Sequence, residues 1–203
     1  GKLLGREALM IRLFVGLELS PSQRESLTYA RGGVEGARWQ RDDQLHLTLA
    51  FIGEVSHRSL REIEGELSRI TFDPFDLTLN DVGMFGKFDM PKTLWAGVED
   101  KAPLMHLHEK VLTAVERAGI GMDHRRYKPH VTLARFKRGA YARIATWLSV
   151  NGVLRSPTER VRHFTLFSSH LTSDGPVYQV EARFGQFVDD MVFDDDMAME
   201  YCA

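Results

Sequence analysis

The chain has 203 residues, of which 43% are hydrophobic and 27% are charged, and a formal net charge of −2. This composition is typical of an ordinary globular protein with one well-buried domain or two small lobes. The single cysteine, Cys202, excludes an internal disulfide and a zinc site built from several cysteines, and it fits a reducing cytoplasm. No apolar run is long enough to span a bilayer, so we expect no membrane partner.

The charge is unevenly distributed along the chain. The residues after Phe187 hold six acidic side chains, and without them the net charge changes from −2 to +4. A mildly basic body permits contact with a phosphate but does not indicate bulk duplex binding. We expect a single domain over residues 10–187, followed by an acidic tail over 188–203. Residues 1–9 are expected to be extra N-terminal residues, because Met10 is a plausible natural start.

Periodicity and capping signals predict the elements of the first half of the chain. A strand over 11–19 is followed by a helix that Ser20 caps and that runs to about Arg31. A strand over 45–52, ended by Gly53, leads to a helix over 57–70 that Ser56 caps. Residues 75–82 alternate as a strand. The glycine-rich loop at 83–86 lacks the Lys-Ser/Thr of a phosphate-binding loop, so a hinge or surface turn is expected there.

The second half repeats this order. A strand over 93–99 precedes a helix from Pro103 to near Gly119, and a further strand begins at His130. Gly139 should end that strand, and a helix is predicted over 140–148. Strands over 162–171 and 177–184 follow, joined by a turn at 173–175. This internal duplication, with a period near 80 residues, predicts two pseudo-symmetric α+β lobes.

Two similar motifs lie 84 positions apart, one in each half. Residues 46–51 read HLTLAF, and residues 130–136 read HVTLARF. Both alternate polar and apolar positions, which is the period of a half-buried strand, so the histidine and the threonine point to the same face. We therefore expect a cleft that is lined by His46 and Thr48 from one strand and by His130 and Thr132 from the other.

Two imidazoles across a cleft support acid–base chemistry, since histidine titrates near neutral pH. One ring takes a proton from water while the other gives a proton to a leaving oxygen. A phosphate diester fits, because its two non-bridging oxygens can accept hydrogen bonds from two threonines, and Lys128 and Arg135 add positive charge. Packing explains the repeated leucine and valine positions but not the repeated polar ones. Symmetry leaves open which histidine plays which role.

These motifs and their flanks resemble the two-histidine (2H) phosphoesterase superfamily. Within it, the chain is most similar to the RNA 2′,3′-cyclic phosphodiesterases, also called 2′-5′ RNA ligases. The resemblance covers residues 10–187. Arg126 and Tyr127 stand where the family pattern has proline and phenylalanine. The matching segments are 12–15 (RLFV), 45–54 (LHLTLAFIGE), 125–135 (RRYKPHVTLAR) and 175–178 (GPVY).

The resemblance implies a duplicated bilobal LigT-like α+β fold, with two antiparallel sheets flanking a central cleft and helices outside. It implies hydrolysis of a terminal 2′,3′-cyclic phosphate to a 2′-phosphomonoester without a metal or other cofactor. The resemblance also implies that His46 is the proton donor and His130 the proton acceptor. The phosphate is bound by Thr48 and Thr132, together with Arg135, and Phe14 or Tyr127 is a candidate for stacking on the terminal base.

The implied partners are RNA 3′ ends that carry a 2′,3′-cyclic phosphate, including tRNA halves, and we expect a cytoplasmic monomer. Three alternatives stay open from the sequence. The first is ligation through a 2′-5′ bond, which uses the same site in reverse. The second is hydrolysis of another cyclic nucleotide or of a 2′-5′ oligonucleotide. The third is a non-catalytic module that binds RNA ends, which loss of either histidine would have favoured.

Other candidates have simpler interpretations. The remaining histidines are expected in solvent or partly buried, although His170 could approach the cleft from the end of a strand. His106 and His108 lie two apart on a helix and make a poor metal pair. The arginines near the first motif are interpreted as solvated charge, with a basic rim for RNA as the alternative. These arginines are Arg24, Arg31, Arg38 and Arg41. The three tryptophans, Trp39, Trp95 and Trp147, are expected to anchor the hydrophobic core.

Overall fold

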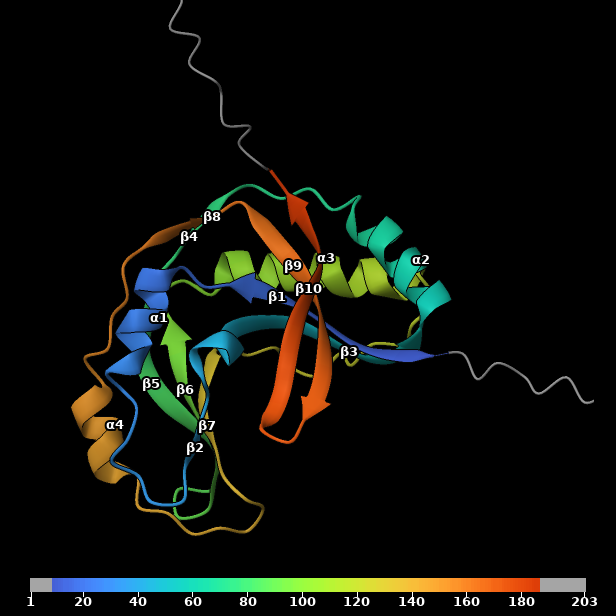
Figure 1. The fold of residues 1–203 in the computed structure, drawn as a ribbon. Coiled ribbons are helices and arrows are strands. Elements are labelled where there is room, and N and C mark those ends of the chain that lie inside the picture. Colours follow the sequence, from blue (N-terminus) through green and yellow to red (C-terminus); the bar gives the residue numbers. More distant parts are fainter. Residues whose placement is uncertain (1–8, 187–203) are drawn as a thin grey trace, which may run out of the picture.

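The structure, a computed structural model, describes residues 9–186. The expectations for residues 1–8, for the acidic tail and for Cys202 lie outside the described residues. The elements shown in Figure 1 are, in chain order, β1 (Met10–Glu18), α1 (Pro21–Thr28), β2 (Arg38–Trp39), a 3₁₀ turn (Asp42–Gln44), β3 (His46–Ser56), α2 (His57–Leu67), β4 (Phe75–Leu77), β5 (Leu79–Gly86), β6 (Pro91–Val98), α3 (Ala102–Arg117), β7 (Val131–Arg135), α4 (Ala145–Asn151), β8 (Glu159–Val161), β9 (His163–Thr172) and β10 (Gly175–Gly185).

The strands form one large antiparallel sheet and a separate pair, β4 with β8. The large sheet has the order β10-β9-β1-β3-β7-β6-β5, and β2 also pairs with β7. β1 pairs with β3 along its whole length, whereas the described residues of β3 and β7 share a single pair, Leu47 with Val131. The large sheet is therefore two antiparallel sheets joined at a narrow waist. The predicted α+β class with antiparallel sheets is confirmed.

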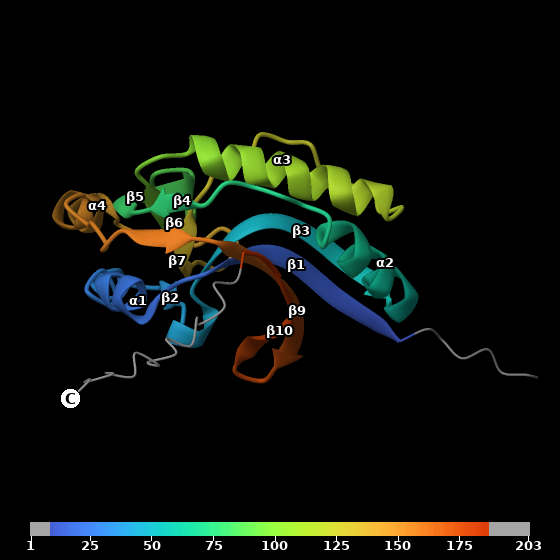
Figure 2. The same cartoon turned by 90° about the horizontal axis from the view of Figure 1, so that it is seen from above.

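The helices pack on the outside of the two sheets. Figure 2 shows α2 and α3 on one side of β1 and β3, with the β9–β10 hairpin curling away on the other side. On the other lobe α1 and α4 lie next to each other. A hydrogen bond links them, in which the indole N–H of Trp147 in α4 donates to the carbonyl of Ala30, just after α1, at 2.7 Å. Each lobe therefore takes elements from both halves of the chain, since α3 and β9–β10 complete the lobe that contains β1.

The hydrophobic core follows the periodicities read from the sequence. Leu13, Val15 and Leu17 alternate inward along β1, and α2 buries Leu60, Ile63 and Leu67 at helical spacing. The predicted caps are also present. The hydroxyl of Ser20 accepts from the amide of Gln23 at 3.2 Å, and the hydroxyl of Ser56 accepts from the amide of Ser59 at 3.1 Å.

The expectation of a single strand over 75–82 and a loop at 83–86 is wrong. The chain makes two strands there, β4 and β5, which belong to different sheets. Gly83 lies inside β5, opposite Trp95 of β6. A Cβ atom at position 83 would lie 2.3 Å from the indole ring of Trp95, so glycine is required by the close approach of that ring. A glycine can thus mark a packing contact rather than a turn.

Three further boundaries differ from the sequence expectation. The second His/Thr strand, β7, ends at Arg135 and not at Gly139. Gly53 does not end the first His/Thr strand, which continues to Ser56 through an irregular pairing with β1; Gly53 has φ 91°, a conformation that favours glycine. The predicted helix over 140–148 begins only at Ala145. Its first residues form a loop instead, because the amide of Ala142 donates to the carbonyl of Asp89, at 3.1 Å, on a distant hairpin.

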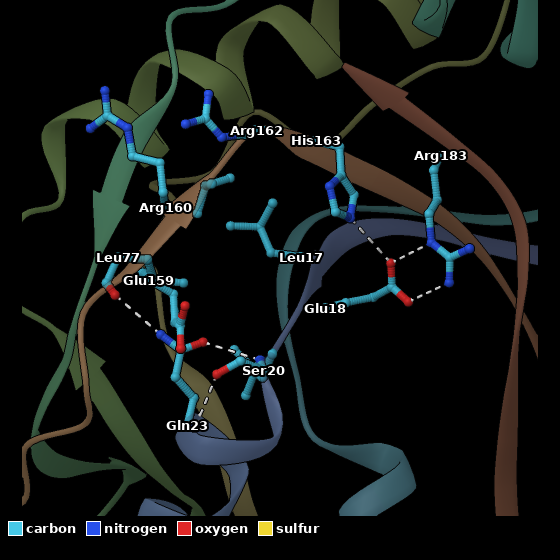
Figure 3. A pocket seen from close by; sticks show the side chains of 12 residues that line it. Leu17, Glu18, Ser20, Gln23, Leu77, Glu159, Arg160, Arg162, His163 and Arg183 are labelled. Carbon is cyan, nitrogen blue, oxygen red and sulfur yellow. Dashed lines mark hydrogen bonds and ion pairs between the residues drawn. The ribbon is translucent and has the colours of Figure 1, made fainter. Parts of the chain in front are cut away.

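A partly buried ion pair fixes the end of β1 to the β9–β10 hairpin. The Glu18 carboxylate accepts two hydrogen bonds from Arg183 and one from Thr165, all at 2.8 Å. Figure 3 shows Glu18, Arg183 and His163 on the wall of a cavity of about 380 Å³. The Arg183 hydrogen bonds are the largest cause that lowers the pKa of Glu18, to about 2. Since Glu18 is also the cross-strand partner of His46, the ion pair anchors the strand beside that histidine.

Glu18→Gln is expected to lower the free energy of unfolding at pH 7 by about 1–2 kcal/mol, after allowance for solvent screening. The folded-state pKa lies below the unfolded value, so this stabilisation is complete above pH 4.5 and is lost as the pH falls toward about 2. Urea unfolding across that range measures it. Equal stability of the variant and the wild type at pH 7, or a difference that persists below pH 2, would contradict this account.

Candidate active site

The waist of the sheet brings the two His/Thr motifs together. Leu47 and Val131 are paired antiparallel and are fully buried, so they point into the core. Their neighbours in the chain must point to the opposite face. Continuing the register places His46 alongside Thr132 and Thr48 alongside His130. The two histidines then form a diagonal cross-strand pair, whose Cβ atoms are roughly 7–8 Å apart in such a ladder.

Both imidazoles are oriented by the same kind of hydrogen bond. Nδ1 of His46 lies 2.7 Å from the carbonyl oxygen of Gln44, and Nδ1 of His130 lies 2.6 Å from that of Lys128. A carbonyl oxygen only accepts, so Nδ1 carries the hydrogen in both rings and Nε2 is the basic nitrogen of the neutral form. Nε2 of His46 lies 2.9 Å from the Thr48 hydroxyl.

The electrostatic environment of the two rings is shared. Burial lowers the pKa of His46 to about 4, with further lowering by the charges of Arg135 and His130, against the opposing hydrogen bond to Gln44. Burial also lowers the pKa of His130, again helped by Arg135. Both rings are therefore neutral at pH 7 in the ligand-free protein. An anion beside Arg135 would favour the charged imidazolium form of either ring.

An aromatic wall supports His46. The ring of Phe14 lies 4.7 Å from the His46 ring and stacks on Phe167 at 4.9 Å, and Tyr178 meets His46 edge-on at 5.1 Å. Phe14 is only 3% exposed, so its ring serves to pack His46, and little of it is open to a base. The stacking of Phe14 on a base therefore stays a prediction, and the close packing of its ring does not favour that role.

Tyr127 does not lie among the residues that line the cleft. Its ring stacks on His108 with centroids 4.1 Å apart, and its hydroxyl donates to the carbonyl of Thr48 at 2.7 Å. Tyr127 thereby holds the β3 backbone next to the threonine of the first motif. His108, expected in solvent or partly buried, is instead buried, because its Nδ1 bonds to the Leu49 carbonyl at 2.7 Å. A local signal was available, because His108 follows Leu104 by four residues and precedes Leu112 by four, which places it on the apolar face of α3.

The second histidine has aromatic neighbours of its own. Phe85 meets the His130 ring edge-on at 4.9 Å, and Trp95 lies 6.2 Å from it. Trp95 is also the cross-strand partner of Thr132. Its indole N–H is buried and has no hydrogen-bond partner among residues 9–186. Trp95 therefore belongs to the surroundings of the second motif, whereas the sequence suggested only a core anchor.

A cleft of about 810 Å³ opens over the first motif. Two arginines, Arg12 and Arg135, face it with a single carboxylate, that of Glu54, so its charge favours an anion. Phe51 is 53% exposed at the cleft, with the Arg12 guanidinium 5.0 Å above its ring. Sequence reasoning missed Phe51 because it alternates with the core positions of β3 and looked like ordinary strand surface. The remaining lining residues are Met10, Phe14, His46, Thr48, Ser169, His170, Leu171, Pro176 and Tyr178.

The basic residues near the first motif divide into two groups. Arg31 pairs with Asp42 at 2.5 Å and Arg41 with Asp43 at 3.1 Å, as expected of solvated surface charge. Arg38 instead stands opposite Arg135 across β2 and β7.

Residues 9–186 contain no cluster of three His, Cys, Asp or Glu side chains that could hold a metal ion. Within the same residues, none of the helices has both the length and the apolar character needed to cross a membrane.

Comparison with known proteins places this geometry in context. The model of the 2′-5′ RNA ligase superfamily matches residues 20–172. The RNA 2′,3′-cyclic phosphodiesterase of Archaeoglobus fulgidus is 33% identical over 172 residues, which cover 83% of this chain and 97% of the relative. The enzyme of the same name from Aquifex aeolicus is 28% identical, over 86% of this chain and 97% of the relative.

Solved structures have the same fold. The crystal structure of E. coli LigT complexed with 3′-AMP superposes with a TM-score of 0.72 at 26% identity, over 89% of this chain and all of that one. A protein from Thermus thermophilus superposes with a TM-score of 0.71 at 29% identity, over 86% of this chain and 97% of its own. The predicted LigT-like fold is thus confirmed.

Sulfate, which does not titrate between pH 4 and 8, is expected to raise the pKa of His46 from its ligand-free value of about 4. Because the bound form has the higher pKa, sulfate affinity should increase as the pH falls from neutral toward that value. An NMR titration of the histidine ring signals with and without sulfate measures both effects. His106, exposed on α3, serves as the internal control. A His46 midpoint unmoved by saturating sulfate would show that no anion site lies beside this ring.

Proposed function

The chain belongs to the 2′-5′ RNA ligase superfamily, and from this premise we propose that it hydrolyses the 2′,3′-cyclic phosphate at RNA 3′ ends to a 2′-phosphomonoester. The membership agrees with the resemblance read from the sequence motifs. The observation that carries the proposal is the single Leu47–Val131 pair, since its register puts both His/Thr motifs on one face. The names of the relatives supply the substrate class.

The proposed reaction is an in-line displacement at phosphorus. Water attacks the phosphorus opposite the 3′ oxygen, and Nε2 of His130 takes the proton that water loses. The bond from phosphorus to the 3′ oxygen breaks, and the leaving oxygen receives a proton from Nε2 of His46. The products are a 2′-phosphomonoester and a 3′ hydroxyl. Each imidazole thus changes protonation state once per turnover, and a proton exchange with solvent restores both.

The phosphate is held by neutral and charged donors. Thr48 and Thr132 donate hydrogen bonds to the two non-bridging oxygens, and Arg135 offsets the charge that develops in the transition state. In the ligand-free protein the Thr48 hydroxyl lies 2.9 Å from Nε2 of His46. Turning that hydroxyl toward the phosphate frees Nε2 to face the leaving oxygen. Phe51, exposed at the cleft, is a better placed partner for a base than Phe14 or Tyr127.

The donor and acceptor roles rest on the family resemblance. The lowered pKa values alone do not select His46 as the donor, because both rings are neutral without a ligand. A bound phosphate stabilises an imidazolium in either ring, so it makes a charged donor available without selecting which histidine that donor is. A cytoplasmic location, a monomeric state and action on tRNA halves remain predictions.

Ligation is a second candidate, and the description of the matching family model favours it. In this direction a 5′-hydroxyl of a second RNA would replace water as the attacking group, so that the same acid–base pair would form a 2′-5′ bond. Incubation of the protein with labelled tRNA halves distinguishes the two directions. A longer labelled RNA indicates ligation, and a 2′-phosphomonoester end indicates hydrolysis.

His46→Ala and His130→Ala are each expected to reduce kcat on a 2′,3′-cyclic nucleotide by about 10²–10⁴-fold, which is the range for loss of a general acid or base. Initial rates measure the loss, and circular dichroism checks that the fold persists. His106→Ala is the matched control, because this histidine is exposed on α3. Near-normal turnover by either motif variant would rule out the two-imidazole mechanism.

Treatment with a chelator is expected to leave the hydrolysis rate unchanged, since the proposed proton transfers and anion contacts all come from side chains. The assay compares the initial rate before and after dialysis against EDTA. A loss of activity that added divalent cations restore would contradict a metal-independent reaction.

A further inference from the structure

Positive charge is concentrated on the lobe that contains β5, β6 and β7. Residues 84–93 and 128–144 include seven Lys and Arg side chains but only one acidic residue, Asp89. All seven are exposed, and none forms an ion pair with another residue of the described chain. Several exposed arginines elsewhere are paired with carboxylates, as Arg155 is with Glu99 at 2.8 Å and Arg160 with Asp76 at 3.1 Å. These seven cations therefore lack the usual protein counter-charge.

The fold gathers the two segments at one end of this lobe. The amide of Phe136 donates to the carbonyl of Lys92, and the amide of Ala142 donates to that of Asp89, both at 3.1 Å. Figure 1 shows the turn between β5 and β6 beside the loop that follows β7, at the lower end of the view. The cations of both segments therefore share one surface.

This surface is connected to the candidate active site through Arg38 and Arg135. The two residues are cross-strand partners on β2 and β7, so their side chains stand next to each other. Like charges in such a position destabilise a sheet, and neither arginine has a carboxylate partner within the described chain. An anion bound between the guanidiniums would remove this repulsion.

Exposed aromatic rings accompany the cations. Phe88, in the β5–β6 turn, is 61% exposed, and Tyr141, in the loop after β7, is 75% exposed. Phe85, three residues before Phe88, meets the ring of His130 edge-on at 4.9 Å. Phe85 lies near the end of β5 and Phe88 in the turn that follows, so the aromatic residues lead from His130 toward the end of the lobe. Cations mixed with exposed aromatic rings are typical of surfaces that bind single-stranded nucleic acid.

We propose that this lobe-tip surface, defined by Lys87, Phe88, Lys137, Arg138, Tyr141 and Arg143, binds the single-stranded RNA upstream of the reacting 3′ end. The inference rests on the proposed function and extends it from the terminal nucleotide to the strand behind it. The cations bind backbone phosphates, and the two rings stack on bases without reading their identity. The substrate is thus an RNA strand whose upstream nucleotides contribute to binding, and a lone cyclic nucleotide lacks these contacts.

The test compares two triple variants of the full chain. Lys137→Gln/Arg138→Gln/Arg143→Gln removes three cations of the lobe-tip surface. Arg61→Gln/Lys101→Gln/Arg117→Gln removes three exposed cations on and beside α2 and α3, and it serves as the control with the same change in net charge. The first readout is the affinity for a labelled single-stranded RNA with a 3′-terminal phosphate, measured by fluorescence anisotropy over a salt series. The second is kcat/KM on that RNA with a 2′,3′-cyclic end and on a 2′,3′-cyclic mononucleotide.

The lobe-tip variant is expected to bind RNA at least about tenfold more weakly, with the slope of log affinity against log salt reduced by about 2 for three lost phosphate contacts. Its kcat/KM should fall on the RNA and stay within about twofold of wild type on the mononucleotide, and the control variant should match wild type on both. Phe88→Ala/Tyr141→Ala should weaken RNA binding without altering mononucleotide hydrolysis.

Three results would overturn the inference. One is unchanged RNA affinity in the lobe-tip variant, and another is equal loss in the control variant, which would indicate a general effect of net charge. The third is an equal loss of kcat/KM on RNA and mononucleotide. Failure of the proposed function looks different, because the wild type would then hydrolyse neither substrate. The anisotropy comparison between the two variants decides on the RNA surface even in that case.

Discussion

The candidate active site depends on one backbone pairing, that of Leu47 with Val131. These two residues are buried where the sheets of the two lobes meet, and the strands separate on either side of them. Because side chains alternate along a strand, burying this pair forces the flanking histidines and threonines onto the opposite face. A slip of one residue in either strand would send that motif into the core. The pairing therefore couples the formation of the core to the assembly of the site.

The charges around this junction suit a transient anion. Two imidazoles and the guanidinium of Arg135 share the face. Burial is the largest cause that lowers the pKa of both histidines, and the charge of Arg135 lowers it further because it repels the protonated ring. Arg38 adds a second guanidinium opposite Arg135. This arrangement is unfavourable in the ligand-free protein and becomes favourable when a phosphate enters. The binding of the substrate and the protonation of the proposed donor would then be parts of the same event, which would allow His46, with a ligand-free pKa of about 4, to serve as the proposed acid at neutral pH.

The sequence predicted those features that depend on local periodicity. The alternation in the two His/Thr motifs, the helical spacing of Leu60, Ile63 and Leu67 and the caps at Ser20 and Ser56 are all local signals, and the structure has them where they were expected. Features that depend on contacts distant in sequence were missed. Gly83 looked like a turn residue because no residue near it in the chain indicates that the ring of Trp95 packs against it. The helical spacing of Leu104 and Leu112 does place His108 on the apolar face of its helix, but its partners, Leu49 and Tyr127, come from other elements and could not be predicted. Phe51 could not be distinguished from ordinary strand surface until the cleft beside it was known.

The most direct measurement is a crystal structure of the protein with a nucleoside 2′-phosphate, the product of the proposed reaction. The account predicts that the phosphorus lies between Nε2 of His46 and Nε2 of His130, with the hydroxyls of Thr48 and Thr132 on its non-bridging oxygens. A phosphate that touches only one histidine, or that binds away from the Leu47–Val131 junction, would contradict it.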